Sequence, residues 1–194
     1  MQSIGRFKIG KRLATGKLGS VWLGVDPEFQ RPVAIKLMDQ PLEDAPAQKR
    51  FLAATQEIGE IHHPGLVSML DAGVQAGCPY LVFEYMQGES LAVWRARPKV
   101  DLQQCLDLFT TLLAAVDEAH QRGMPHGKLS LSNIRVSSEG LPRVLDFGVA
   151  LACSGQSEDS TDGSQPYLAP ERGAGGVCTT QADVYSLGVI LFEL

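Results

Sequence analysis

The feature that most constrains this chain is a change in the period of its apolar residues near residue 86. Before that point, apolar residues recur at every second position, as in Phe7 and Ile9, then Val21, Leu23 and Val25, then Val33, Ile35 and Leu37. A period of two is typical of half-buried β-strands, and turn-forming residues separate these segments. After Gly88 the spacing becomes three to four, as in amphipathic helices. The chain therefore predicts a strand-rich part followed by a helical part, an α+β architecture.

Three helices are expected from this spacing. Residues 45–61 end before Pro64 and place one side at Phe51, Ala54, Ile58 and Ile61. Residues 102–120 carry apolar residues at Leu102, Leu106, Phe109, Leu113 and Val116. Residues 184–194 are apolar almost throughout, which predicts a buried core helix. Further strands are expected at 66–73, 80–85, 134–136 and 143–145.

Composition excludes several classes of function. The 194 residues suffice for one domain with a sizeable core, and 20% charged residues with a net charge of −5 include no basic stripe for nucleic acid. The apolar stretch at 184–194 is too short to span a bilayer, and the first residues lack the apolar core of a signal peptide. The four cysteines form no C-x-x-C pair, so no zinc site is indicated. A cytoplasmic domain without membrane contact is expected.

Two short segments in the first part carry chemistry. Residues 13–21, with Gly16 and Gly19, form a glycine loop whose backbone N–H groups can approach phosphate oxygens. The loop leads into a strand and not into a helix, so it is not a dinucleotide fingerprint. Lys36 ends the segment 33–36, and a lysine in a half-buried strand needs an anionic partner.

Three further motifs follow in order: Asp146-Phe147-Gly148, Ala169-Pro170-Glu171, and the segment 183–188 that begins with Asp183. Each alone could arise by chance, but their order and spacing are highly specific. With them the whole chain resembles the eukaryotic-type Ser/Thr protein kinases.

The resemblance implies a two-lobed protein-kinase-like fold in a single domain, 1–194. Residues 1–86 would form a β-rich N-lobe with one main helix, and residues 87–194 a partial, helical C-lobe. The chain stops at Leu194 inside the central helix, so we expect a truncated C-lobe that lacks its last helices and exposes an apolar patch.

The resemblance also implies ATP and Mg²⁺ as cofactors. The residues around ATP would be Gly16, Gly19, Val21, Ala34, Glu84, Met86 and Arg135, with Phe83 as gatekeeper. Lys36 would pair the α/β-phosphates, and Asn133 and Asp146 would hold Mg²⁺. Ser164 falls where Ser/Thr kinases carry a threonine. Internal packing and hydrogen bonding are expected of His126, Phe147 and Asp183. Glu171 is expected to form an ion pair with a partner past the end of the chain.

The catalytic loop, residues 126–133, departs from the family pattern. Lys128 stands where the family has the aspartate that accepts the substrate hydroxyl proton. Loss of a positioned general base typically costs about 10²–10⁴ in rate. Ser130 replaces the loop lysine that neutralises the transferring phosphoryl group, and Gly127 replaces the arginine that clamps a phosphorylated activation loop.

Two departures lie outside that loop. Counting along residues 45–61 places Ala54 where the family has the glutamate that pairs with the lysine, and Glu57 lies one turn further on. Arg135 stands where the family has an apolar residue beneath the adenine. The alternation in 134–136 predicts that its neighbours point into the core while Arg135 faces the other way. A guanidinium there would either stack on the base or block it.

Three hypotheses follow. The first is a pseudokinase that binds ATP, is catalytically impaired and acts as a regulatory or binding module on a protein partner. The second is an atypical active Ser/Thr kinase, a transferase of signalling pathways, that uses another base to phosphorylate a protein substrate. The third is an interaction domain that binds no nucleotide because Arg135 fills the pocket.

Overall fold

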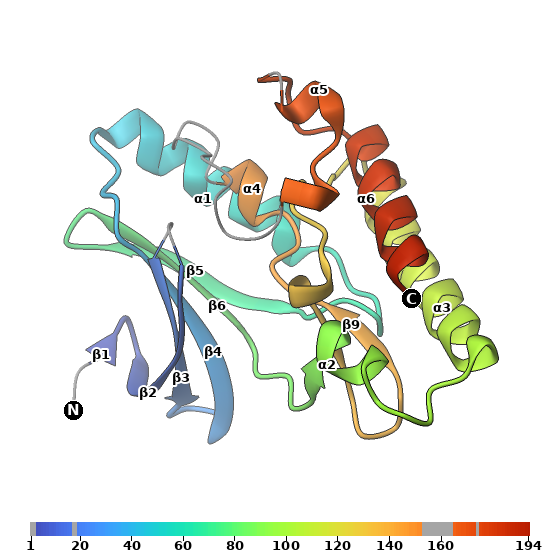
Figure 1. Cartoon of the computed structure of the whole chain (residues 1–194). Helices are drawn as coiled ribbons and strands as arrows, with labels where there is room; N and C mark the ends of the chain where they lie inside the picture. Colours follow the sequence, from blue (N-terminus) through green and yellow to red (C-terminus); the bar gives the residue numbers. More distant parts are fainter. Residues whose placement is uncertain (1–2, 17–18, 153–164, 174) are drawn as a thin grey trace. The chain divides into compact units, whose positions relative to one another are not determined.

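The computed structural model describes residues 3–16, 19–152, 165–173 and 175–194 (Figure 1). The chain divides into two compact units. Unit 1 comprises residues 1–60 and 68–86, and unit 2 comprises residues 61–67 and 87–194. One domain with lobes at 1–86 and 87–194 stays a prediction.

Unit 1 is built on a six-stranded antiparallel sheet. Its strands in spatial order are β1 (Ser3–Ile4), β2 (Phe7–Gly16), β3 (Gly19–Asp26), β4 (Arg31–Met38), β6 (Cys78–Glu84) and β5 (Met69–Gln75). The period-two prediction is confirmed in the core, because Phe7, Val33 and Ile35 are all 0% exposed. The strand predicted at 66–73 begins later, and Leu66 instead forms an isolated bridge to Val144 within unit 2.

Helix α1 (Ala45–Gly59) packs on β5. Asp44 caps it, since the carboxylate accepts a hydrogen bond of 2.7 Å from the backbone N–H of Ala47. Phe51, Thr55 and Ile58 form its buried side. The predicted helix is therefore confirmed, although it ends before Ile61, and Thr55 rather than Ala54 is fully buried.

A buried carboxylate ties the sheet of unit 1 together at the end of β3. Asp26 is 0% exposed, and its carboxylate lies 3.5 Å from the guanidinium of Arg6 and 3.8 Å from that of Arg31. Burial acts to raise the pKa of the Asp26 carboxyl, but hydrogen bonds from the backbone of Glu28 and Phe29 and the charge of Arg6 outweigh it. The pKa of Asp26 therefore lies below its ordinary value.

Unit 2 contains a small antiparallel sheet and most of the helices (Figure 1). Its sheet has the order β7 (Glu89–Ser90), β8 (Ile134–Val136) and β9 (Pro142–Val144). Its helices are α2 (Leu91–Arg95), α3 (Leu102–His120), η1 (Leu131–Asn133), α4 (Val149–Ala152), η2 (Gln165–Tyr167), α5 (Pro170–Gly173) and α6 (Thr180–Glu193). Asp101 and Gln104 form a capping box at the start of α3, which fixes where that helix begins.

Helices α3 and α6 run antiparallel beside each other (Figure 1). At one end the His120 ring meets the Asp183 carboxylate at 2.9 Å, and at the other Cys105 lies 3.5 Å from the carbonyl oxygen of Leu194. Helix α3 also packs against β9.

The predicted apolar face of α3 is partly wrong. Leu102, Leu106 and Leu113 are exposed at 73%, 42% and 41%. The buried side consists of Cys105, Leu108, Phe109, Leu112, Ala115, Val116 and Ala119. Large leucines outweighed small residues in the sequence pattern, whereas close helix packing favours the side that carries small ones.

Helix α6 confirms only one side of the predicted buried helix. Ala182, Leu187 and Ile190 are buried, but Val184 is 62% and Phe192 is 91% exposed. The other side of α6 therefore carries exposed apolar side chains. That this exposure reflects a truncated C-lobe stays a prediction.

Candidate functional site

The lysine-bearing face of unit 1 follows from strand register. Lys36 on β4 pairs with Val21 on β3, and Ala34 pairs with Phe83 on β6. Residues directly opposite each other in an antiparallel sheet point to the same side. Val21, Ala34 and Lys36 therefore share one face of the sheet, as a common nucleotide-binding surface requires, and Lys36 is half-buried there.

The glycine loop forms the end of the β2–β3 hairpin, where Gly16 pairs with Gly19. Gly19 has φ of 143°, and a Cβ atom at this position would lie 1.8 Å from the carbonyl oxygen of Leu37. Only glycine satisfies both conditions, because the backbone is left-handed and no space remains for a side chain. The hairpin tip between these two glycines lies outside the described residues.

The segment that should meet the adenine edge lies at the end of β6. Phe83 is 5% and Met86 is 9% exposed, and Glu84 is half-buried. The Glu84 N–H donates to the carbonyl oxygen of Ser68 at 3.0 Å, which ties the end of β6 to the start of β5.

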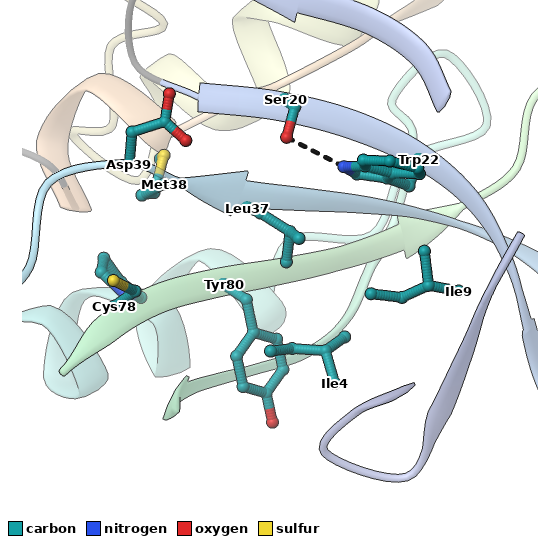
Figure 2. Close-up of a pocket in the computed structure, with 10 residues that line it drawn as sticks. Ile4, Ile9, Ser20, Trp22, Leu37, Met38, Asp39, Cys78 and Tyr80 are labelled. Carbon is teal, nitrogen blue, oxygen red and sulfur yellow. Dashed lines mark hydrogen bonds between the residues drawn. The ribbon is translucent and has the colours of Figure 1, made fainter. Parts of the chain in front are cut away.

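A cavity of about 320 Å³ lies on the opposite face of this sheet (Figure 2). Leu37 and Tyr80, which pair across β4 and β6, both line it, as does Trp22, whose indole N–H donates to the Ser20 hydroxyl at 2.8 Å. Leu37 alternates with Lys36 along β4 and so points away from the lysine's face. This cavity is thus distinct from the predicted nucleotide surface.

Glu57 does not replace the missing glutamate. It lies on the exposed side of α1, and in the described part of the chain it forms no ion pair. Ala54 carries no carboxylate, so α1 offers Lys36 no acidic partner at either predicted position.

In unit 2, the Asp183 carboxylate at the start of α6 holds the catalytic-loop backbone. Asp183 is 1% exposed and accepts from the N–H groups of His126 at 2.6 Å and Gly127 at 2.8 Å. Its third contact is the His120 Nε2 atom at 2.9 Å. The internal hydrogen-bonding role predicted for Asp183 agrees with this geometry, while the part played by His120 was not foreseen.

The His126 ring sets the next part of the loop. Its Nδ1 atom accepts from the Lys128 N–H at 3.1 Å, so Nε2 carries the proton and donates to the carbonyl oxygen of Leu145 at 2.8 Å. The ring also meets Phe147 edge-on, with centroids 5.2 Å apart. His126 is 1% and Phe147 4% exposed, as expected for packing residues.

The Lys128 backbone also anchors Asn133. The Asn133 side-chain amide donates to the Lys128 carbonyl at 2.6 Å, and the Leu145 N–H donates to the Asn133 carbonyl at 2.8 Å. Asp146 follows Leu145 with φ of 57°, a left-handed conformation that is uncommon for aspartate. Asn133, Asp146 and Lys128 thus belong to one hydrogen-bonded loop assembly within unit 2.

The side chain of Lys128 is half-buried and has no carboxylate partner among the residues that the structure describes. Ser130, which replaces the loop lysine, is 3% exposed and bonds the Ser132 hydroxyl at 2.8 Å. The loop therefore presents one cation and no carboxylate between His126 and Asn133.

Gly127 stands where an arginine was expected, and the structure gives the reason. Its φ is 78°, and a Cβ atom would lie 2.4 Å from the Cys178 sulfur and 3.2 Å from the Ala150 methyl. A larger residue at 127 would have to adopt this left-handed backbone and displace the Cys178 side chain.

Arg135 faces away from the core, as its alternation predicted. Ile134 and Val136 are 0% and 1% exposed, whereas Arg135 is half-buried and its guanidinium donates to the Gly88 carbonyl. Arg143 lies directly opposite on β9.

Tyr167 connects the segment before α5 to α6, which sequence reasoning missed. Its hydroxyl donates to the Glu193 carboxylate, and its carbonyl accepts from Ser186 at 2.7 Å. Burial and the neighbouring Glu193 carboxylate raise the pKa of Tyr167 to about 12. Glu171 is exposed and forms no ion pair among the described residues. Its expected pairing with a residue past the end of the chain stays a prediction.

Other predictions concern absences or undescribed residues. Ser164 lies outside the described residues. Across the described ranges, no group of three His, Cys, Asp or Glu side chains is arranged to hold a metal ion. Within those ranges, too, every helix is too short or too polar to cross a membrane.

Comparison with known proteins gives consistent matches. The family described as "Protein kinase domain" matches residues 7–194. The chain is 35% identical over 195 residues to a probable serine/threonine-protein kinase PknB of Lactococcus lactis, covering 97% of this chain and 31% of that protein. It is 32% identical over 195 residues to the serine/threonine-protein kinase PrkC of Bacillus subtilis (98% of this chain, 30% of PrkC). It is also 32% identical over 199 residues to the serine/threonine-protein kinase PknA of Mycobacterium tuberculosis (97% of this chain, 46% of PknA). The chain thus spans a third to a half of the length of these relatives.

Proposed function

Because this chain belongs to the protein kinase domain family, we propose that it is a kinase-like ATP-binding domain whose phosphoryl transfer is impaired. On this proposal it acts as a pseudokinase, a regulatory or binding module for a protein partner. The observation that carries the proposal is the ammonium of Lys128 at the position of the general base, on a loop that is otherwise fully anchored.

The chemical argument concerns charge. A general base must accept the proton of the attacking hydroxyl, and a protonated amine has no lone pair with which to do so. Asp183 and His126 hold the loop backbone in place. The expected defect therefore comes from the missing carboxylate and not from a disordered loop. The expected consequence is a rate lower by about 10²–10⁴.

The chain's residues fit a bound magnesium nucleotide in part. The Asn133 amide nitrogen is used on the Lys128 carbonyl, which leaves its side-chain oxygen as a hard ligand that could act together with the Asp146 carboxylate. Mg²⁺ there would neutralise phosphate charge, and Lys36 would contact the α/β-phosphates. Gly16, Gly19, Val21, Ala34, Glu84 and Met86 would surround the rest of ATP.

One rival proposal is an active, atypical Ser/Thr kinase. Its support is the retention of Lys36, Asn133 and Asp146, together with relatives named as serine/threonine-protein kinases. Phosphoryl transfer depends largely on positioning and electrostatics, so some activity without the aspartate is chemically reasonable. A second rival, an interaction domain that binds no nucleotide, rests on the guanidinium of Arg135.

The remaining parts of the proposal follow from the family. We expect a single domain, 1–194, with lobes at 1–86 and 87–194, in the cytoplasm. A protein would be its partner or substrate. Nucleic acid and membrane contact by this segment are not expected.

The test is transfer of labelled γ-phosphate from ATP·Mg²⁺ by the unmodified chain and by Lys128→Asp. The proposal expects no transfer by the former and measurable transfer by the latter, with Lys128→Asn as a control that removes the charge without supplying a base. Robust transfer by the unmodified chain, abolished by Asp146→Asn, would instead establish the active kinase. Binding of ATP is measured in parallel by calorimetry, because a chain that binds no nucleotide supports the third hypothesis.

A further inference from the structure

We propose that Arg135 is a gate for the nucleobase: its guanidinium, anchored on the Gly88 carbonyl, holds closed the floor on which an adenine would lie. This inference rests on the proposed ATP binding and adds a residue that limits it. The proposed function requires that the chain binds a nucleotide, and the proposed gate adds that Arg135 weakens this binding.

The direction of Arg135 is set by its strand. Ile134 and Val136, its neighbours on β8, are 0% and 1% exposed, so both point into the core of unit 2. Successive side chains of a strand point to opposite faces, and Arg135 therefore stands on the outer face of the β7–β8–β9 sheet. That outer face is where the family's apolar floor residue would be.

The acceptor of Arg135 is held in place independently. Gly88 has φ of 142°, and a Cβ atom there would lie 2.3 Å from the carbonyl oxygen of Val136. The backbone of Gly88 therefore packs directly on β8, and β7 begins at the next residue and pairs Glu89 with Val136. Because Gly88 cannot shift easily, its carbonyl offers Arg135 a fixed anchor close to its own strand.

Charge around Arg135 favours the same anchor. Arg143 lies directly opposite on β9, and like charges at opposed positions repel. The Arg143 guanidinium donates to the Leu66 carbonyl at 2.9 Å, so the two guanidinium groups are held by separate backbone carbonyls. The carboxylate of Glu89, the acidic residue next to Gly88, is engaged 2.7 Å from Arg97. Among the described residues, no carboxylate forms an ion pair with Arg135.

The anchored state leaves a donor of Arg135 unsatisfied. The Nε atom of Arg135 is buried and has no hydrogen-bond partner in the described part of the chain. A buried donor without a partner is unfavourable, so nothing in unit 2 requires an arginine here for stability. An apolar residue of similar length would remove that cost and leave the outer face flat.

The consequence is competition for one surface. A base that lies on the outer face of β8 requires the Arg135 guanidinium to leave Gly88, and the bond that it breaks involves a charged donor. Stacking of the guanidinium on the base would offset this loss only if the group stayed parallel to the sheet, while its bond to the Gly88 carbonyl holds it at the edge toward β7. Nucleotide affinity is therefore lower than the other groups of the proposed site would allow.

The experiment is calorimetry of ATP·Mg²⁺, ADP and adenosine with the unmodified chain, Arg135→Leu and Arg143→Leu. We expect Arg135→Leu to bind all three ligands about tenfold more tightly, the effect of about one charged hydrogen bond. Arg143→Leu removes the same charge from the same sheet without touching the Gly88 carbonyl, and no gain is expected from it. Adenosine carries no phosphate, so a gain with adenosine separates the gate from any change in net charge.

The outcomes are distinct. Equal or weaker binding by Arg135→Leu, with binding by the unmodified chain intact, refutes the gate and leaves the proposed function standing. If neither the unmodified chain nor Arg135→Leu binds a nucleotide at millimolar concentration, both the gate and the proposed ATP binding are wrong. Without ligand, the midpoint of thermal unfolding of Arg135→Leu should equal or slightly exceed that of the unmodified chain. This control shows whether the substitution causes a folding defect.

Discussion

Replacement of Asp183 by alanine should strongly destabilise the chain, because this residue of α6 holds the backbone of the catalytic loop. The Asp183 carboxylate is 1% exposed and joins three donors, the N–H groups of His126 and Gly127 and the ring of His120. Alanine provides no acceptor, so these donors would lose their partner in a buried place. The backbone N–H groups are the critical ones, because they cannot turn toward solvent.

The magnitude follows from the number of unsatisfied groups. Each buried donor without a partner costs about 1–3 kcal/mol, and hydrogen bonds to a charged acceptor lie at the upper end. Two backbone donors, at 2.6 and 2.8 Å, therefore predict a loss of about 3–5 kcal/mol in the free energy of unfolding. Asp183→Asn keeps one acceptor oxygen and should lose about half as much.

Urea denaturation followed by fluorescence measures the loss, and amide exchange at His126 and Gly127 locates it. Asp107→Ala is the matched control, because Asp107 is exposed on α3 and its carboxylate accepts a hydrogen bond only from Gln103 among the described residues. A loss below about 0.5 kcal/mol is expected for it. If Asp183→Ala cost no more than Asp107→Ala, the argument that Asp183 holds the loop backbone would be refuted.

Three further predictions follow from the same structure. Gly127→Ala should lower the free energy of unfolding by about 1–3 kcal/mol, because φ is 78° and the added methyl meets the Cys178 sulfur. Partial recovery of stability in a double variant with Cys178→Ala would locate the clash. A Gly127→Ala variant as stable as the unmodified chain would contradict the prediction. Because the pKa of Asp26 is lowered in the folded chain, Asp26 contributes fully to the free energy of unfolding above its pKa in the unfolded chain, about 4. This contribution is lost as the pH falls through the folded pKa. Unfolding curves of Asp26→Asn and the unmodified chain should therefore differ at pH 7 and approach each other as the pH falls through the folded pKa of Asp26. A difference that does not change with pH would argue against the assignment. Ultraviolet titration should show Tyr167 ionising near pH 12. Its contribution to the free energy of unfolding is present below pH 10, the ordinary pKa of tyrosine, and is lost as the pH rises through the folded pKa. Tyr167→Phe should remove this late titration step, and a titration unchanged by the substitution would count against the bond to Glu193.

The strand-rich half was the easier part to predict. Alternation at Val33, Ile35 and Leu37 identified β4 and the face on which Lys36 lies, because successive residues of a strand point to opposite faces of the sheet. Helix α3 was harder: its leucines at 102, 106 and 113 satisfied helical spacing but lie outside the core. Two overlapping stripes of apolar residues fit a helical period, and only the elements packed against α3, β9 among them, decide which stripe is buried.

The candidate site divides in the same way. Motif order identified Lys36, Asn133 and Asp146, and it exposed Lys128 as a departure from the pattern. The roles of His120, Tyr167 and Glu193 could not be predicted, since their contacts join residues far apart in the chain, such as His120 and Asp183. No local pattern marks such pairs.

The sequence by itself determined the family, the order of the motifs and the chemistry of the groups present, because residue identity decides which atoms can donate, accept or carry charge. Only the tertiary structure decided how those groups are used. It placed the sulfur of Cys178 where a side chain at residue 127 would lie, and the Gly88 carbonyl within reach of Arg135. Both outcomes depend on distances between segments remote in sequence, and packing of the whole unit sets those distances.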